Sequence, residues 1–130
     1  MQITRDWNFV SASYIMLQYR KWQLKDRKTL SLKQFHHECS NQMAADLRIK
    51  KTATQIRDKI NNTRSTYHVI LKQDSSTTQM KDINMNVAVF DVMKFLYDHN
   101  KKVTLDDIEQ RLQILIGNWN AQNKSSSLLQ

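Results

Sequence analysis

The chain has no proline and only one glycine, Gly117, among its 130 residues. Tight turns and hairpins depend on these two residue types, because glycine and proline adopt or fix the backbone angles that such turns need. Their scarcity argues against a sheet built from hairpins and favours helices. A single glycine also excludes a glycine-rich phosphate-binding loop and a dinucleotide-binding fingerprint.

Metal ligands and catalytic residues are equally scarce. Cys39 is the only cysteine, which excludes an internal disulfide. His36 stands three positions before it, but structural zinc needs four ligands with a recognisable spacing. We therefore interpret Cys39 as a core residue and expect no metal site. Asp106, Asp107 and Glu109 stand at a predicted helix N-terminus, where acids complement the helix dipole, so they do not form a catalytic pair. We expect no enzyme activity, no catalytic residue and no cofactor.

Long apolar runs are missing too. No stretch approaches the roughly 18 apolar residues of a membrane span. The opening "MQITRDWNFV" lacks the apolar run of a signal peptide. We expect an intracellular protein with no membrane contact.

The positive charge is concentrated in the first half of the chain. The net charge is +8, from 20 Lys/Arg and 12 Asp/Glu. Residues 1–74 hold 14 Lys/Arg and 6 Asp/Glu, and residues 75–130 hold 6 of each, so the whole excess lies before residue 75. A basic half of this kind attracts polyanions such as nucleic acid, an anionic membrane face or an acidic protein.

Helical periodicity predicts an all-α fold. Apolar residues recur at helical spacing in five segments, 4–22, 30–47, 52–71, 84–100 and 104–119. Capping signals at Ser31, at Thr52 with Gln55 and at Thr104 with Asp107 support three of the helix starts. The predicted core of the first three helices consists of Trp7, Tyr14, Leu17, Phe35, Met43, Ile56, Ile60 and Tyr67.

The chain divides at one polar stretch. "KQDSSTTQMKD" has no periodicity and is the best candidate for a linker. The predicted organisation is a basic three-helix module (1–74), a polar linker (75–83), a C-terminal two-helix hairpin (84–122) and a disordered tail (123–130).

The third predicted helix carries the candidate binding face. In "TATQIRDKINNTRSTY" the apolar Ile56, Ile60 and Tyr67 fall on one side, which leaves the opposite side polar and basic. A helix fits the DNA major groove, where Arg pairs with guanine and Asn or Gln with adenine. Lys50 and Lys51, just before the helix, suit phosphate contacts. The candidate DNA-binding residues are Lys50, Lys51, Thr54, Gln55, Arg57, Asp58, Asn61, Asn62 and Arg64.

Residues 4–72 resemble the Myb/SANT-like and homeobox-like helix-turn-helix domains. Trp7 in "RDWNFV" and Phe35 in "LKQFHHECSNQM" are similar to the aromatic residues of that family's first and second helices. In the third helix Gln55, Arg57 and Lys59 match a Gln-Cys-Arg-x-Lys-Trp pattern, whereas Ile56 and Ile60 stand where Cys and Trp are usual. The resemblance implies a three-helix module that binds double-stranded DNA in the nucleus. SANT-type members use the same helices to bind proteins, so an adaptor without DNA binding is the alternative.

The C-terminal hairpin leaves two interpretations open. Its apolar residues occupy more than one face, which indicates either a protein-binding surface or completion of the first module's core. Phe90, Phe95 and Trp119 are the candidate partner-binding residues. A small protein of this kind resembles the Myb- or homeobox-like accessory subunits of ciliate DNA adenine methyltransferase assemblies. In such an assembly it would not be the catalyst, because that methyltransferase family's Asp-Pro-Pro-Trp motif needs prolines.

Overall fold

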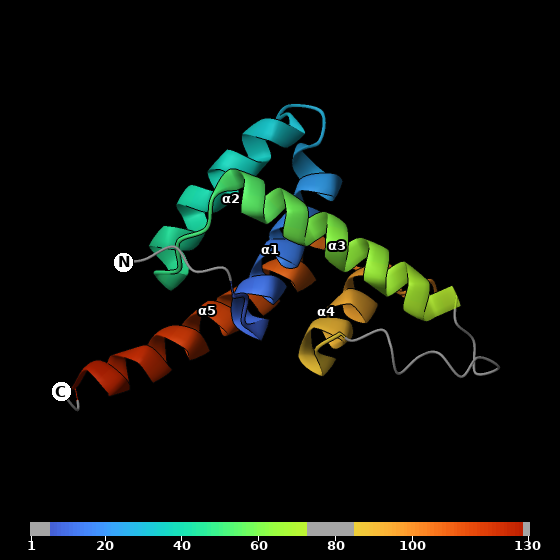
Figure 1. The fold of residues 1–130 in the computed structure, drawn as a ribbon. Helices are drawn as coiled ribbons and strands as arrows, with labels where there is room; N and C mark the ends of the chain where they lie inside the picture. The colour runs from blue at the N-terminus through green and yellow to red at the C-terminus, as the bar shows by residue number, and fades with distance from the viewer. Residues whose placement is uncertain (1–5, 73–84, 129–130) are drawn as a thin grey trace.

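The computed structural model describes residues 6–72 and 85–128, and within these ranges the protein contains five α-helices and no strand (Figure 1). The prediction of an all-α fold is confirmed. The helices are α1 (Phe9–Lys21), α2 (Leu32–Leu47), α3 (Ala53–Lys72), α4 (Val87–Tyr97) and α5 (Leu105–Leu128), with one π-helical segment, η1 (Trp22–Asp26), directly after α1. All five predicted helices are present. The predicted linker, residues 75–83, lies outside the described residues.

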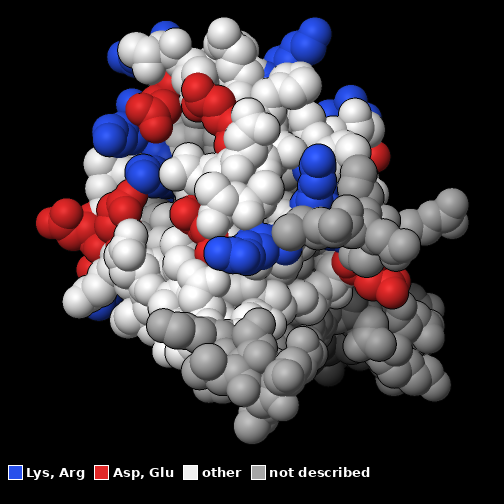
Figure 2. Space-filling view, turned by 90° about the vertical axis from the view of Figure 1, so that its left-hand side faces the viewer, with Lys and Arg blue, Asp and Glu red and all other residues white. Residues whose placement is uncertain are grey.

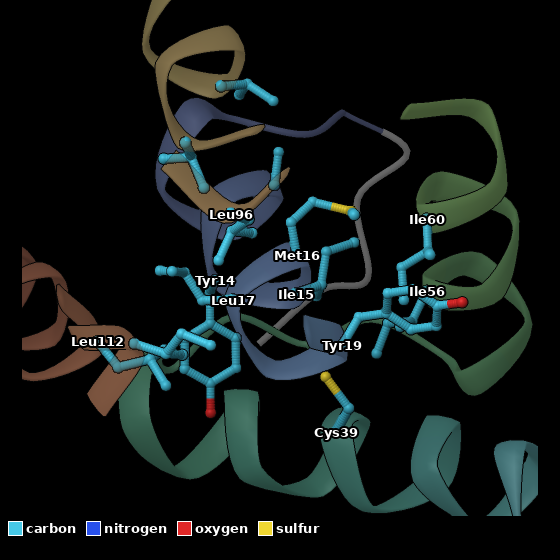
Figure 3. Packing of buried hydrophobic residues seen from close by; sticks show 14 of the residues in the cluster. Tyr14, Ile15, Met16, Leu17, Tyr19, Cys39, Ile56, Ile60, Leu96 and Leu112 are labelled. Atoms are coloured by element: carbon cyan, nitrogen blue, oxygen red, sulfur yellow. The ribbon is translucent and has the colours of Figure 1, made fainter. Parts of the chain in front are cut away.

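Helix α1 lies in the centre of the molecule. It packs against α2, α3, α4 and α5, and every residue from Val10 to Leu17 is buried. Side chains from all four surrounding helices approach it, among them Cys39, Ile56, Leu96 and Leu112 (Figure 3). The sequence predicted a single apolar stripe on this helix. The whole circumference is buried instead, because Ser11, Ala12 and Ser13 on the remaining faces are small enough for close packing.

The C-terminal hairpin completes the core. Both α4 and α5 pack along α1, and the buried apolar cluster is continuous from Val10 to Leu112. The sequence left open whether the hairpin completes the core or binds a partner. The buried sides of α4 and α5 complete the core. The two halves of the chain share one core and are not independent modules.

The starts of α2, α3 and α5 follow the predicted capping signals, whereas α1 begins at Phe9 and not at residue 4 as predicted. Ser31 Oγ accepts a hydrogen bond from Gln34 N at 3.1 Å, and Thr104 Oγ1 accepts one from Asp107 N at 3.1 Å. At α1 the cap is Asn8, whose Oδ1 accepts a bond from Ser11 N at 2.8 Å. Each cap satisfies one of the backbone N–H groups that a helix start leaves without an intrahelical partner.

Two segments differ from the prediction, the one after α1 and the end of α5. The basic segment after α1 continues as a π-helical turn, which brings Trp22 against Tyr19 and Phe35 at ring-centroid distances of 5.8 and 5.7 Å. Helix α5 runs on to Leu128, past the point where the sequence predicted a disordered tail. Nothing after residue 117 in this helix is a glycine or proline, so no residue there terminates it.

Candidate nucleic-acid interface

Helix α3 has one buried and one exposed side. Ile56, Ile60, Thr63 and Tyr67 are buried, and the helix packs against α1 and α2. These residues recur every three or four positions, so they form one stripe and leave the opposite side of the helix facing outward. In Figure 1, α3 lies across the outside of α1, where that polar side is open to solvent.

Five of the predicted DNA-contacting side chains of α3 share this exposed side. Thr54, Arg57, Asp58, Asn61 and Asn62 are all exposed. They extend along the first three turns of the helix and combine hydrogen-bond donors and acceptors with one cation and one anion. This set can contact the edges of bases or the polar surface of a protein.

Arg57 and Asp58 form an ion pair with each other. Asp58 Oδ1 accepts hydrogen bonds from Arg57 Nη2 at 3.0 Å and from Arg57 Nε at 3.1 Å. More than half of each side chain is exposed, so the pair adds little stability and opens readily for a ligand.

The side chain of Gln55 caps the start of α3. Its Oε1 accepts a hydrogen bond from Thr52 N at 2.9 Å, while Thr52 Oγ1 accepts one from Gln55 N at 3.1 Å. The predicted capping box is thus confirmed. The side chain that the sequence also proposed for base recognition folds back over the first turn.

Lys51 does not lie where the sequence predicted. Lys50 is exposed, but Lys51 is only 1% exposed. Its Nζ donates a hydrogen bond to the backbone oxygen of Asp6 at 2.6 Å and lies 4.8 Å from the centroid of the Trp7 ring. Burial lowers the pKa of the Lys51 ammonium group, and the negative charge of Asp6 opposes this shift. Lys51 therefore connects the segment before α1 to the start of α3, and of these two lysines only Lys50 is placed to contact a phosphate.

Arg64 stands apart from the other candidates. It is half-buried, and its guanidinium carbon lies 5.2 Å from the centroid of the Tyr19 ring. The side chain points toward the α4 side of α3, away from the outward line of Asp58 and Asn61.

A basic hollow that sequence reasoning missed adjoins the start of α3. It has a volume of about 340 Å³, and Lys33, His36 and His37 from α2 line it together with Thr54 and Arg57 from α3. Burial is the main cause that lowers the pKa of His36, followed by the nearby charge of Arg57. The sequence contained a weak signal for this arrangement, because a short connector between the two helices brings a basic helix start close to its neighbour.

The candidate partner-binding residues have internal contacts. The Phe90 ring lies 5.6 Å from Tyr67, the Phe95 ring lies 4.4 Å beneath the Arg111 guanidinium, and Trp119 Nε1 donates a hydrogen bond to Leu47 O at 2.7 Å. All three are half-buried against the core. The more exposed large apolar side chains near this region are Phe9, Val87 and Ile114.

One face of the molecule carries charges of both signs and, over the part that the structure describes, no continuous basic patch (Figure 2). On the face drawn in Figure 2, Lys and Arg side chains alternate with Asp and Glu around a broad uncharged surface. Among the described residues, no group of three or more His, Cys, Asp or Glu side chains could hold a metal ion. Within the same residues, no helix combines the length and apolar character needed to span a membrane. Cys39 is buried, as predicted for a core residue.

Comparison with protein-family models, curated proteins and solved structures found no match to this chain.

Proposed function

We propose that the protein binds double-stranded DNA without catalysing a reaction, using the exposed side of α3 and the basic residues beside it. The observation that carries this proposal is the exposure of Arg57, Asn61 and Asn62 along the polar side of α3, with Asn61 facing outward and the other two on its flanks. Arg and Asn are the residue types that pair bidentately with guanine and adenine in the major groove. Lys50 and the hollow lined by Lys33 and His37 flank that face and suit phosphate contacts.

We further infer that α1, α2 and α3 form a helix-turn-helix of the Myb/SANT-like or homeobox-like kind. Packing of α3 on both α2 and α1 supports this assignment, as does the short connector between α2 and α3. The burial of Phe35 and of the α3 stripe supports it too, whereas Trp7, expected as the core tryptophan of the first helix, lies before α1 and is only partly buried.

The biological setting we propose is that of a nuclear accessory subunit, of which a DNA adenine methyltransferase assembly is one example. The exposed Phe9 and Ile114 line a groove of about 230 Å³ between α1, α4 and α5, and this groove could receive a partner subunit. The alternative is a SANT-like adaptor that binds protein through α3 and does not bind DNA.

A mobility-shift titration of the full chain with duplex DNA at two salt concentrations separates these two functions. DNA binding predicts a shift at low salt and a steep loss of affinity at higher salt, because counterions are released from the phosphates. Arg57→Ala should weaken binding, whereas Asn61→Ala should reduce the preference between duplexes of different sequence. Lys102→Ala, an exposed cation in the connector before α5, serves as the control. The adaptor alternative predicts no shift at either salt concentration.

A further inference from the structure

A second basic hollow lies between α1, α3 and the end of α4. Its volume is about 330 Å³. Arg20 of α1 and Arg64 of α3 contribute two guanidinium groups, and the rings of Tyr67 and Tyr97 with the side chain of Met93 contribute apolar surface. The sequence did not indicate this site, because its residues come from segments far apart in the chain.

Arg20 is held in place by Tyr97 and Gln23. Its guanidinium carbon lies 4.6 Å from the centroid of the Tyr97 ring. Gln23 Oε1 accepts hydrogen bonds from Arg20 Nη1 at 3.2 Å and from Tyr97 Oη at 2.7 Å, which fixes the plane of the guanidinium group. The Nε atom of Arg20 is buried and has no hydrogen-bond partner among the described residues. This atom is closed off from solvent, so it is an unsatisfied donor of the protein interior and not a contact for a ligand in the hollow.

Arg64 adds a second positive charge and forms no ion pair with an acid of the described residues. Within the described residues the ion pairs are Lys21 with Glu109 and Arg57 with Asp58. Asp98 also lines the hollow, but its Oδ1 accepts a hydrogen bond from Asn100 N at 2.9 Å and it forms no ion pair with either arginine. Two guanidinium groups and one carboxylate therefore line the same concave surface, and no ion pair joins the carboxylate to either arginine.

The tyrosine side chains of the hollow are neutral at pH 7, as an ordinary phenol is, and burial moves the pKa of Tyr97 further from neutrality. Burial raises the pKa of Tyr97 to about 12, although the charges of Arg20 and Arg64 act in the opposite direction. At neutral pH the phenol therefore adds no negative charge that would offset the two arginines.

We propose that this hollow binds a small phosphomonoester with an apolar or aromatic body, the class to which nucleoside monophosphates belong. A phosphomonoester carries close to two negative charges at neutral pH and matches two guanidinium groups, whereas each phosphodiester of a DNA backbone carries one. Guanidinium groups bind phosphate oxygens through paired hydrogen bonds. Tyr67 and Met93 would pack against the body of the ligand. This binding goes beyond DNA recognition and does not depend on it.

The test uses the ¹⁵N-labelled full chain, observed through the Nε–H signals of its arginine side chains. It is titrated separately with inorganic phosphate, with deoxyadenosine monophosphate and with a 12-base-pair duplex that has no terminal phosphates. We expect the Arg20 and Arg64 signals to shift and saturate with both phosphate and the mononucleotide, at lower concentration with the mononucleotide. Arg64→Gln should weaken mononucleotide binding at least about tenfold, because a charge-assisted hydrogen-bond pair is lost.

The control is Lys72→Gln, which removes one positive charge from α3 about two turns later, at an exposed position that lines neither hollow. It should leave mononucleotide affinity unchanged. The proposal is overturned if the parent shows no saturable shift, if both variants lose affinity equally, or if only the duplex shifts the two arginine signals. A chain that binds the mononucleotide but retards no duplex would retain this site and contradict the proposed DNA binding.

Discussion

The indole Nε1 of Trp119, on α5, donates a hydrogen bond to the backbone oxygen of Leu47, the last residue of α2, at 2.7 Å. The next residue, Asn120, donates from Nδ2 to the oxygen of Asp46 at 3.0 Å. The last four carbonyl groups of a helix have no intrahelical partner. Helix α5 therefore supplies donors for the C-terminal end of α2 and ties the last helix to the first half of the chain.

Trp119→Phe should lower the free energy of unfolding by about 1 kcal/mol, because it keeps an aromatic ring but removes the donor to Leu47. Chemical denaturation followed by circular dichroism measures the change. Gln122→Ala, an exposed position on the same helix, should stay within about 0.5 kcal/mol of the parent. Equal stability of the parent and Trp119→Phe would show that this hydrogen bond contributes nothing.

Arg48 ends α2 in the left-handed region, with φ 58° and ψ 33°. Side chains with a Cβ are strained in this region, and glycine is the usual residue at such helix ends. Arg48→Gly should therefore raise the free energy of unfolding by about 0.5–1 kcal/mol. Arg48→Ala tests the reason, because it removes the same side chain but keeps the Cβ and should give no such gain. A loss of stability in the glycine variant would contradict the assignment.

Gly117 lies inside α5, where its backbone freedom is not needed. A Cβ built at this position meets no atom within 4 Å, and the residue is exposed. Gly117→Ala should stabilise the protein by about 0.5–1 kcal/mol, because alanine loses less conformational entropy in a helix. A thermal melt that shows the midpoint unchanged or lower would contradict the helical conformation at this residue.

Lys50 and Lys51 should respond differently to the same change. Lys50→Glu alters an exposed charge and should weaken DNA binding to all sequences alike, with little effect on stability. Lys51→Glu places an acid beside the Asp6 carbonyl oxygen in a buried site and should destabilise the fold by several kcal/mol. Denaturation and mobility-shift titrations of the two variants measure both effects. Equal stability of the two would contradict the burial of Lys51.

Stability should fall at alkaline pH. Burial raises the pKa of Cys39 from 9.0 to about 12, and that of Tyr97 from 10.0 to about 12. Between these values the unfolded chain has lost protons that the folded protein retains, so folding is favoured fully below about pH 9 and less as the pH rises. Each such group contributes a slope of up to about 1.4 kcal/mol per pH unit.

The check is denaturation of the parent, Cys39→Ala and Tyr97→Phe between pH 8 and pH 11. Each variant lowers stability at pH 8 but should show a shallower decline above pH 9, because one titrating group is gone. Parallel curves for all three proteins would mean that these two groups do not cause the alkaline loss.

The helical fold and most helix starts were predictable because their determinants are local. Apolar spacing marks α3, and capping pairs such as Thr52 with Gln55 mark a helix start within a few residues. The same locality explains why the central place of α1 was missed. Ser11 and Ser13 are polar in sequence, and only the arrival of α4 and α5 makes them interior positions.

The candidate site was predictable to a similar extent. The outward direction of Asn61 and the position of Arg57 at the side of the helix follow from helical geometry alone. The difference between Lys50 and Lys51 does not, because it depends on Trp7 and Asp6 meeting the start of α3 across more than forty residues. The meeting of Arg20 with Arg64 likewise arises only from tertiary packing.

The central position of α1 determines the order in which the core can form during synthesis of the chain. During synthesis α1 leaves the ribosome before the four helices that cover it, and two of its faces stay open until residues 87–116 have been made. Until then its apolar side chains can bind a chaperone or another nascent chain. Folding of this core is thus completed only after α4 and α5 have been made, and a chain interrupted before α4 carries an uncovered α1 for quality control to recognise.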